Sequence, residues 1–96
     1  MHAVVRTYSG KGAKKLIDVV EKNKTEVEGL LRAINGFVSY YLVRTARGGF
    51  TVSVYQDKAG TDESIRMARD WIAKNAGNLG AAAPTVSEGT VVFQLK

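Results

Sequence analysis

Apolar residues follow two different periodicities along the chain, and the alternation between them outlines six elements of secondary structure. Short runs rich in β-branched and aromatic residues, bounded by turn-forming residues, predict strands. Four such runs are present, at residues 3–8, 37–45, 50–57 and 90–96. Between the first and second runs, and between the third and fourth, apolar residues recur three or four positions apart, which predicts helices.

The first predicted helix covers about residues 12–34 as one continuous segment. Its apolar stripe consists of Leu16, Val20, Val27, Leu30, Leu31 and Ile34. Gly29 lies inside this helix, at a cost of up to about 1 kcal/mol relative to alanine. Asn35 and Gly36 are typical of a helix C-terminus and are expected to end it.

The second predicted helix begins at Thr61, a capping residue followed by two acidic residues. Its inner face is formed by Ile65, Ala68, Trp71, Ile72 and Ala76. Residues 78–88 are small and polar and include the only proline, so they are expected to form a loop. The resulting β-α-β-β-α-β order predicts a ferredoxin-like α+β fold, with a four-stranded antiparallel sheet and two helices on one face. We expect a single domain over residues 1–96.

The hairpin of the two central strands allows the faces of the sheet to be derived. A turn at Gly48-Gly49 places odd residues of the first strand beside even residues of the second, unless a bulge intervenes. One face then holds Ser39, Tyr41, Val43, Thr45, Phe50, Val52 and Val54; the other holds Val38, Tyr40, Leu42, Arg44, Thr51, Ser53 and Tyr55. Neither face has the strongly polar alternation of a solvated face. We therefore expect the helices to cover one face and a second copy of the chain to cover the other, in a homodimer.

We assign the more aliphatic of these two faces to the helices. This assignment makes Ser39, Tyr41 and Trp71 the candidate lining of a pocket between sheet and helices. The residues of the more polar face are then candidates for a barrel interior or a dimer seam: Tyr40, Arg44, Ser53 and Tyr55. Each also has a structural interpretation, which we favour: a helical apolar stripe is usually core, and tyrosine is common in strands. Arg44 is suited equally to a bound carboxylate or phenolate and to an acid across the dimer.

The amino-acid composition excludes more kinds of active site than the net charge does. The chain has no cysteine and a single histidine, His2, which excludes a catalytic triad and nearly excludes a His/Cys metal site. The net charge is +5, but the basic residues are dispersed and many have an acidic residue four positions away, as on a solvated helix face. No apolar run is long enough to span a membrane, and the N-terminus lacks a signal-peptide core. We expect a cytoplasmic protein with no membrane partner.

The stretch "RGGFTVSVY", residues 47–55, half-matches the signature strand of RNA-recognition motifs, whose aromatic residues stack on bases. Val52 stands where the central stacking aromatic residue would be needed. A sheet covered by a second subunit also cannot stack bases. RNA binding is therefore the least favoured hypothesis, and we expect no nucleic-acid partner.

The segment "INGFVSYYLVRTARGGFTVSVYQD" after a long first helix, with the helix "DESIRMARDWIAKN", resembles the dimeric α/β-barrel superfamily. The resemblance is closest to its antibiotic-biosynthesis-monooxygenase-like group and extends over residues 3–88. It implies two sheets closed into one barrel across a dimer, and a pocket between each sheet and its helices. Some members oxidise polyphenols with molecular oxygen and no cofactor, others degrade haem, and many have no assigned activity.

The haem-degrading pattern of that superfamily does not carry over to this sequence. That pattern has asparagine on the first strand, tryptophan at the end of the third and histidine on the second helix. Here the first strand offers Arg6, Thr7 and Tyr8, Tyr55 stands about where the tryptophan would be, and the helix has no histidine. The resemblance thus implies a monooxygenase without cofactor, acting on a small aromatic or polyphenolic compound. The alternative is a non-catalytic dimer that binds a small apolar ligand or is purely structural.

Overall fold

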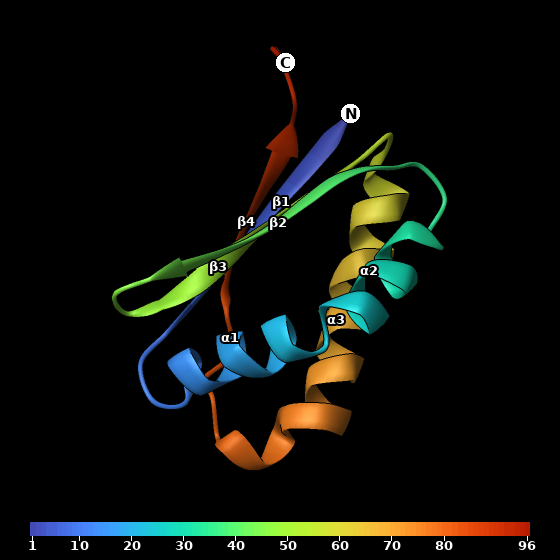
Figure 1. The fold of residues 1–96 in the computed structure, drawn as a ribbon. Coiled ribbons are helices and arrows are strands. Elements are labelled where there is room, and N and C mark those ends of the chain that lie inside the picture. The colour runs from blue at the N-terminus through green and yellow to red at the C-terminus, as the bar shows by residue number, and fades with distance from the viewer.

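The computed structural model describes residues 1–96 and contains a four-stranded antiparallel sheet with every helix on one side. The strands are β1 (His2–Ser9), β2 (Phe37–Thr45), β3 (Gly48–Tyr55) and β4 (Thr85–Thr90), in the order β2-β3-β1-β4. The helices are α1 (Ala13–Lys22), α2 (Lys24–Arg32), α3 (Lys58–Ala76) and the 3₁₀ turn η1 (Gly77–Leu79). Figure 1 shows the opposite face of the sheet bare. The ferredoxin-like fold predicted from the sequence is confirmed.

The first helix is not continuous as predicted, because Asn23 ends α1 and α2 begins at the next residue. The backbone N–H of Asn23 donates to the carbonyl oxygens of Val19 and Val20 at 3.2 and 3.1 Å. Its side-chain amide donates to the Val19 carbonyl as well, at 2.8 Å. These carbonyls at the end of α1 are thereby satisfied, and α2 leaves in a new direction alongside α3 (Figure 1).

The second helix begins three residues before the predicted Thr61. Asp57 is its N-cap, with a side-chain oxygen that accepts a hydrogen bond from the Gly60 N–H at 3.1 Å. Thr61 instead lies buried in the first turn, where its hydroxyl donates to the Lys58 carbonyl at 2.9 Å. The prediction chose the wrong cap because both residues are good N-caps and the apolar stripe begins only after Thr61.

The last strand was predicted at residues 90–96 and lies instead at 85–90, within the segment expected to be a loop. β4 runs antiparallel to β1, from the Thr7–Thr85 pair to the His2–Thr90 pair. The Val91 N–H still bonds to the Met1 carbonyl at 2.9 Å. Beyond that point β1 offers no further backbone, so residues 92–96 leave the sheet with Val92, Phe93 and Leu95 exposed.

The register of the hairpin follows the prediction, with Tyr40 opposite Ser53 and Leu42 opposite Thr51. A bulge lies between Phe37 and Ser39, at the start of β2. The assignment of the faces is wrong. The side that packs under the helices carries the buried residues Thr51, Ser53 and Tyr55, and the side with Phe50, Val52 and Val54 is the bare one.

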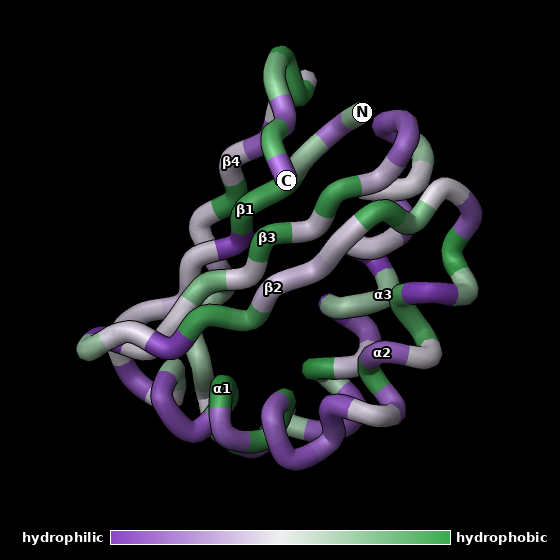
Figure 2. The backbone as a smooth tube through the Cα atoms, turned by 45° about the horizontal axis from the view of Figure 1, so that its top comes forward, coloured by the Kyte–Doolittle hydropathy of each residue, from purple (hydrophilic) through white to green (hydrophobic).

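The helices lie on that side because small residues there allow close approach. A Cβ atom added to Gly49 would stand 2.9 Å from the Ile17 side chain of α1. A Cβ atom on Gly60 of α3 would stand 2.8 Å from the Tyr55 ring. Figure 2 shows the hydrophilic residues of α1 on the side away from the sheet. None of the helices is long and apolar enough to be a transmembrane segment.

Candidate functional site

A cleft lies between the helix-covered face of the sheet and the helices. Its outer part is a groove of about 490 Å³ between α1, α2 and β2. Its inner part is a cavity of about 30 Å³ that reaches α3. The two parts adjoin because both are lined by Ile17, Val20, Val27, Leu31, Tyr40 and Leu42. The cleft therefore leads from the edge of the sheet, where charged residues such as Glu21, Glu28 and Arg44 line the groove, to a mainly apolar inner cavity.

Three polar side chains meet in the inner cavity. Arg6 and Tyr8 of β1 are buried, and Tyr40 of β2 lies on the same face. Nη1 of Arg6 donates to the Tyr8 hydroxyl at 3.4 Å, a long hydrogen bond. None of the ion pairs in the structure involves Arg6. The Arg6 guanidinium is thus a buried cation without a carboxylate partner.

The tyrosines of the cavity are hydrogen-bond donors at neutral pH. Burial raises the pKa of Tyr8, and the nearby Arg6 charge offsets only part of that rise. Burial likewise raises the pKa of Tyr40, again with a smaller opposing contribution from Arg6. Both phenols therefore stay protonated and are suited to donate to an oxygen of a ligand rather than to act as bases.

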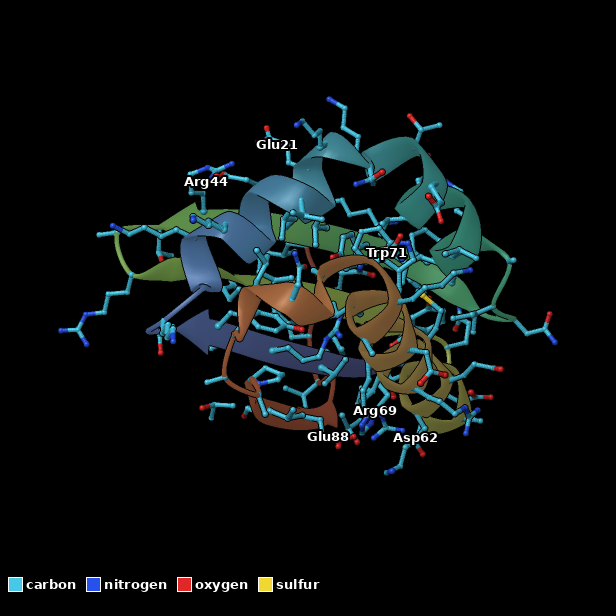
Figure 3. All side chains as sticks on the ribbon, turned by 90° about the horizontal axis from the view of Figure 1, so that it is seen from below. Glu21, Arg44, Asp62, Arg69, Trp71 and Glu88 are labelled. Atoms are coloured by element: carbon cyan, nitrogen blue, oxygen red, sulfur yellow. The ribbon has the colours of Figure 1, made fainter.

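Arg44 lies at the mouth of the groove, where β2 faces α1. Its Nη1 donates to Asp18 Oδ1 and its Nη2 to Glu21 Oε1, each at 2.6 Å. The hydrogen bond to Asp18 is the main reason why the pKa of Arg44 is raised. Figure 3 shows Arg44 and Glu21 together at this edge. Both sequence-based interpretations of Arg44 placed it on the uncovered face, and that placement is wrong, since it pairs with acids of its own chain.

Trp71 lies between α2 and α3 (Figure 3), with its side chain in the wall of the inner cavity. Its indole N–H donates to Glu26 Oε2 at 3.1 Å. The nitrogen is therefore not free for a ligand, and the apolar ring face is what Trp71 contributes to the cleft. Trp71 is thus buried, as the core interpretation requires, and lines the cavity as well.

The structure does not bring Ser39 and Tyr41 to Trp71. Both lie on the bare face of the sheet, opposite Val54 and Val52, and Tyr41 is 61% exposed. The predicted pocket is therefore divided between the two faces. Its place beside Trp71 is taken by Tyr40, which had been assigned to the barrel interior or dimer seam.

The other residues assigned to that seam also lie under the helices. Ser53 is fully buried, and its hydroxyl has no hydrogen-bond partner. Tyr55 is buried too, and its hydroxyl donates to the Leu31 carbonyl of α2 at 2.9 Å. The polar residues on this face were expected to line a water-filled barrel interior. They are instead small, or hydrogen-bonded within the chain, and helices can cover them.

Arg6 and Tyr8 are the site residues that the sequence-based prediction missed. The signal was present in β1, where Val4, Arg6 and Tyr8 alternate on one face of a central strand. A cationic side chain at such a position is flanked by residues of β3 and β4. Because the helices cover this face of the sheet, the side chain is buried beneath them.

No group of three or more His, Cys, Asp or Glu side chains is arranged to hold a metal ion. The polar groups of the inner cavity are one guanidinium and the hydroxyls of Tyr8, Tyr40 and Thr51, besides the indole of Trp71. These groups are mainly hydrogen-bond donors. The site is therefore a cleft in a ferredoxin-like fold whose inner end is lined by donors and apolar side chains.

Several solved structures share this fold. NE2512 of Nitrosomonas europaea, a protein of unknown function, matches with a TM-score of 0.72 at 13% identity, over 99% of this chain and 91% of that chain. SnoaB of Streptomyces nogalater, a cofactor-independent oxygenase, matches with a TM-score of 0.66 at 16% identity, over 98% and 95%. MhuD of Mycobacterium tuberculosis, a haem degrader with two haems in its active site, matches with a TM-score of 0.65 at 16% identity, over 99% and 98%.

The sequence matches no family model and no curated protein. At these identities the likeness to solved structures is one of fold. The chain has the same fold as SnoaB and as two proteins described as putative antibiotic biosynthesis monooxygenases, as the sequence resemblance predicted.

Proposed function

We propose that this protein binds a small aromatic compound in the cleft and oxidises it with molecular oxygen, without a cofactor. The observation that carries the proposal is the inner cavity, where a guanidinium and two protonated tyrosines meet among apolar side chains at the inner end of the cleft. Such a cavity suits the oxygen substituent of a flat ring that lies in the adjoining groove. The cofactor-independent oxygenase SnoaB, which has the same fold, supports the choice of reaction.

The reaction balances with a phenol as the substrate. The ring gives up its hydroxyl proton, and the electron-rich ring carbon opposite the oxygen forms a bond to dioxygen. The resulting peroxide anion takes up a proton to become a hydroperoxide. The same ring carbon then loses its hydrogen as a proton while the O–O bond breaks, and the released hydroxide takes up a proton. One oxygen atom stays as a quinone carbonyl and the other leaves as water. Tyr8 and Tyr40 hold the ring oxygen by hydrogen bonds while the charge on it changes.

One feature of the cleft favours a second candidate function. The inner cavity has no Asp, Glu or His in its lining, and its tyrosines are protonated at neutral pH. No evident base therefore lines the inner cavity beside the ring oxygen, and a substrate proton would have to leave to water. A non-catalytic protein that only binds an aromatic ligand needs no such base.

Haem is not the ligand that these residues suit. The only histidine, His2, lies at the start of β1 and contacts Glu88 at 2.9 Å. Neither part of the cleft has a histidine in its lining. The nitrogen ligand that commonly holds haem iron is thus absent from the cleft, which agrees with the sequence pattern and separates this chain from MhuD.

Oxygen consumption separates the two candidate functions. We expect uptake with some members of a panel of phenols, naphthols and hydroquinones, and one atom of ¹⁸O₂ in the quinone product. Tyr40→Phe removes a donor to the ring oxygen and should lower kcat/KM at least about tenfold. Tyr41→Phe is the matched control, since it removes a hydroxyl on the bare face. Ligand binding without uptake across the panel would reject the oxygenase and leave the binding protein.

We also propose that the protein is a homodimer joined through the bare faces of its sheets. That face carries Phe50, Val52 and Val54 of β3, which are only partly buried, and the exposed Tyr41 of β2. A sheet face of such residues is unfavourable in water. A second copy presents the same face, so the two surfaces match by symmetry.

A further inference from the structure

We infer that Arg6 makes the inner end of the cleft a receptor for an anionic oxygen. The cleft would then select planar aromatic ligands that carry a carboxylate or an ionised phenol over neutral ones. The inference deepens the proposed function and rests on its placement of the ligand in this cleft. It does not depend on the oxidation step.

The buried charge of Arg6 is left without compensation within the chain. The Arg6 side chain lies on a central strand, the residue is 4% exposed, and no carboxylate pairs with it. A buried charge without a partner destabilises a fold. The inner cavity has 14 lining residues and none is acidic. An anion that enters the cavity would therefore meet one positive charge and no opposing negative charge.

One edge of the Arg6 guanidinium has no hydrogen-bond partner within the chain. Nη1 is occupied by the long bond to Tyr8, whereas Nε has no partner and no hydrogen bond from Nη2 is present. Nε and Nη2 together form the side of arginine that binds a carboxylate through two parallel hydrogen bonds. Thr51 lies directly opposite Arg6 on β3, and its buried hydroxyl also lacks a partner. These donors complete a site for an oxygen anion.

The shape of the cleft suits a ligand with a charged head and a flat apolar body. The inner cavity, about 30 Å³, exceeds the roughly 10–15 Å³ that one water needs but is too small for an aromatic ring. The adjoining groove of about 490 Å³ has room for the ring among Ile17, Val27 and Leu31. Such a ligand fits this sequence of spaces with its head inward.

A binding comparison tests the inference directly. Trp71 is the only tryptophan and lines the inner cavity, so its fluorescence reports occupation of the site. We expect 2-naphthoate to bind at least about tenfold more tightly than the neutral isostere 2-naphthamide, because hydrogen bonds to charged groups are the stronger ones. Arg6→Met should abolish this preference and Arg6→Lys should keep part of it.

A second arm separates the phenolate from the carboxylate. Ionised 4-nitrophenol absorbs visible light, so its titration can be followed with and without protein. If the site accepts a phenolate, the wild-type protein lowers the apparent pKa of the bound phenol and the Arg6→Met protein does not. A preference for naphthoate without this shift would assign the site to carboxylates, which also supports the inference.

Arg47→Met is the matched control. Arg47 is another arginine without an ion pair, but it is exposed in the turn between β2 and β3 and lines neither part of the cleft. It should leave the naphthoate preference unchanged. Equal binding of naphthoate and naphthamide to the wild type would overturn the inference, as would a preference lost in Arg47→Met and kept in Arg6→Met.

Thermal unfolding distinguishes a receptor from a structural residue. Arg6→Met removes an unpaired buried charge at similar side-chain length, so we expect its Tm to rise. A lower Tm with an unchanged naphthoate preference would mean that Arg6 only supports the fold, and would overturn the inference. Binding is read without turnover, so a protein that binds naphthoate but consumes no oxygen would refute the oxygenase proposal alone.

Discussion

At the scale of single residues, Tyr55 connects the sheet directly to the helices. It is fully buried on β3, its hydroxyl reaches the Leu31 carbonyl of α2, and its ring meets Phe37 edge to face at 5.7 Å. Gly60 of α3 lies against the same ring. One side chain thus contacts β2, α2 and α3, and two of its partners, Leu31 and Phe37, line the outer groove.

Tyr55→Phe should lower the free energy of unfolding by about 1 kcal/mol, the usual net value of one hydrogen bond. The loss stays this small because the Leu31 carbonyl keeps a second hydrogen bond from the Ile34 N–H at 3.3 Å. Urea denaturation at neutral pH measures the difference. A loss of several kcal/mol would contradict this expectation and would mean that the packing around the ring had also changed.

The same hydroxyl should make the stability depend on alkaline pH. Burial raises the pKa of Tyr55 from 10.0 to about 12. Since the folded pKa lies above the unfolded one, the contribution to stability is fully present below pH 10 and is lost as pH rises through about 12. Denaturation midpoints followed up to that pH should fall less steeply in Tyr55→Phe than in the wild type. Parallel curves would contradict the assignment.

The division of residues between the two faces could be predicted only in part. The alternation and the Gly-Gly turn correctly paired Tyr40 with Ser53 and Leu42 with Thr51. They could not show which face the helices cover, because the face that helices pack against is determined by the size of its side chains as much as by their polarity. Thr51 and Ser53 are polar but small, and both lie buried under helices.

At the scale of secondary-structure elements, local patterns predicted the order of the fold well and its boundaries less well. The stripe from Leu16 to Ile34 keeps a helical period across Asn23, so periodicity alone could not reveal the break at that residue. The end of β4 was missed for a different reason. Residues 92–96 have strand-forming side chains, but a strand also needs a neighbour, and β1 has ended.

Two helical glycines, Gly29 and Gly60, should respond to alanine in opposite directions. A Cβ atom added to Gly29 of α2 would have nothing within 4 Å, so Gly29→Ala gains helix propensity and should stabilise the protein by up to about 1 kcal/mol. Gly60→Ala forces a methyl group to within 2.8 Å of Tyr55, and overpacking of this kind costs roughly 1–3 kcal/mol.

Urea denaturation of both alanine variants measures the two changes, and each variant is the control for the other. The expected signs differ because only one of these glycines is needed for close packing. A shift in the same direction for both would contradict this interpretation of α3, since it would mean that the contact between Gly60 and Tyr55 is loose enough to absorb a methyl group.

At the scale of the whole molecule, a single chain exposes more surface than its mass accounts for. Its accessible surface is 6176 Å², whereas a folded monomer of 10.4 kDa exposes about 5400 Å². The excess is about 800 Å², which is close to what each partner buries in an interface of standard size. Much of it comes from the tail after β4, where Val92, Phe93 and Leu95 are 93%, 77% and 81% exposed.

We expect twice the chain mass in solution because the bare face carries the partly exposed apolar residues of β3. Val52→Lys places a charge near the centre of that face and should give a monomer by light scattering at micromolar concentration. Leu30→Lys is the matched control, because Leu30 is a partly exposed apolar residue on the helical side, and it should leave the dimer intact. A wild-type monomer would refute the dimer, and dissociation by Leu30→Lys alone would move the interface to the helices.

Because the cleft lies under the helices of each chain, a Val52→Lys monomer that still binds 2-naphthoate would show that the site is complete within one chain.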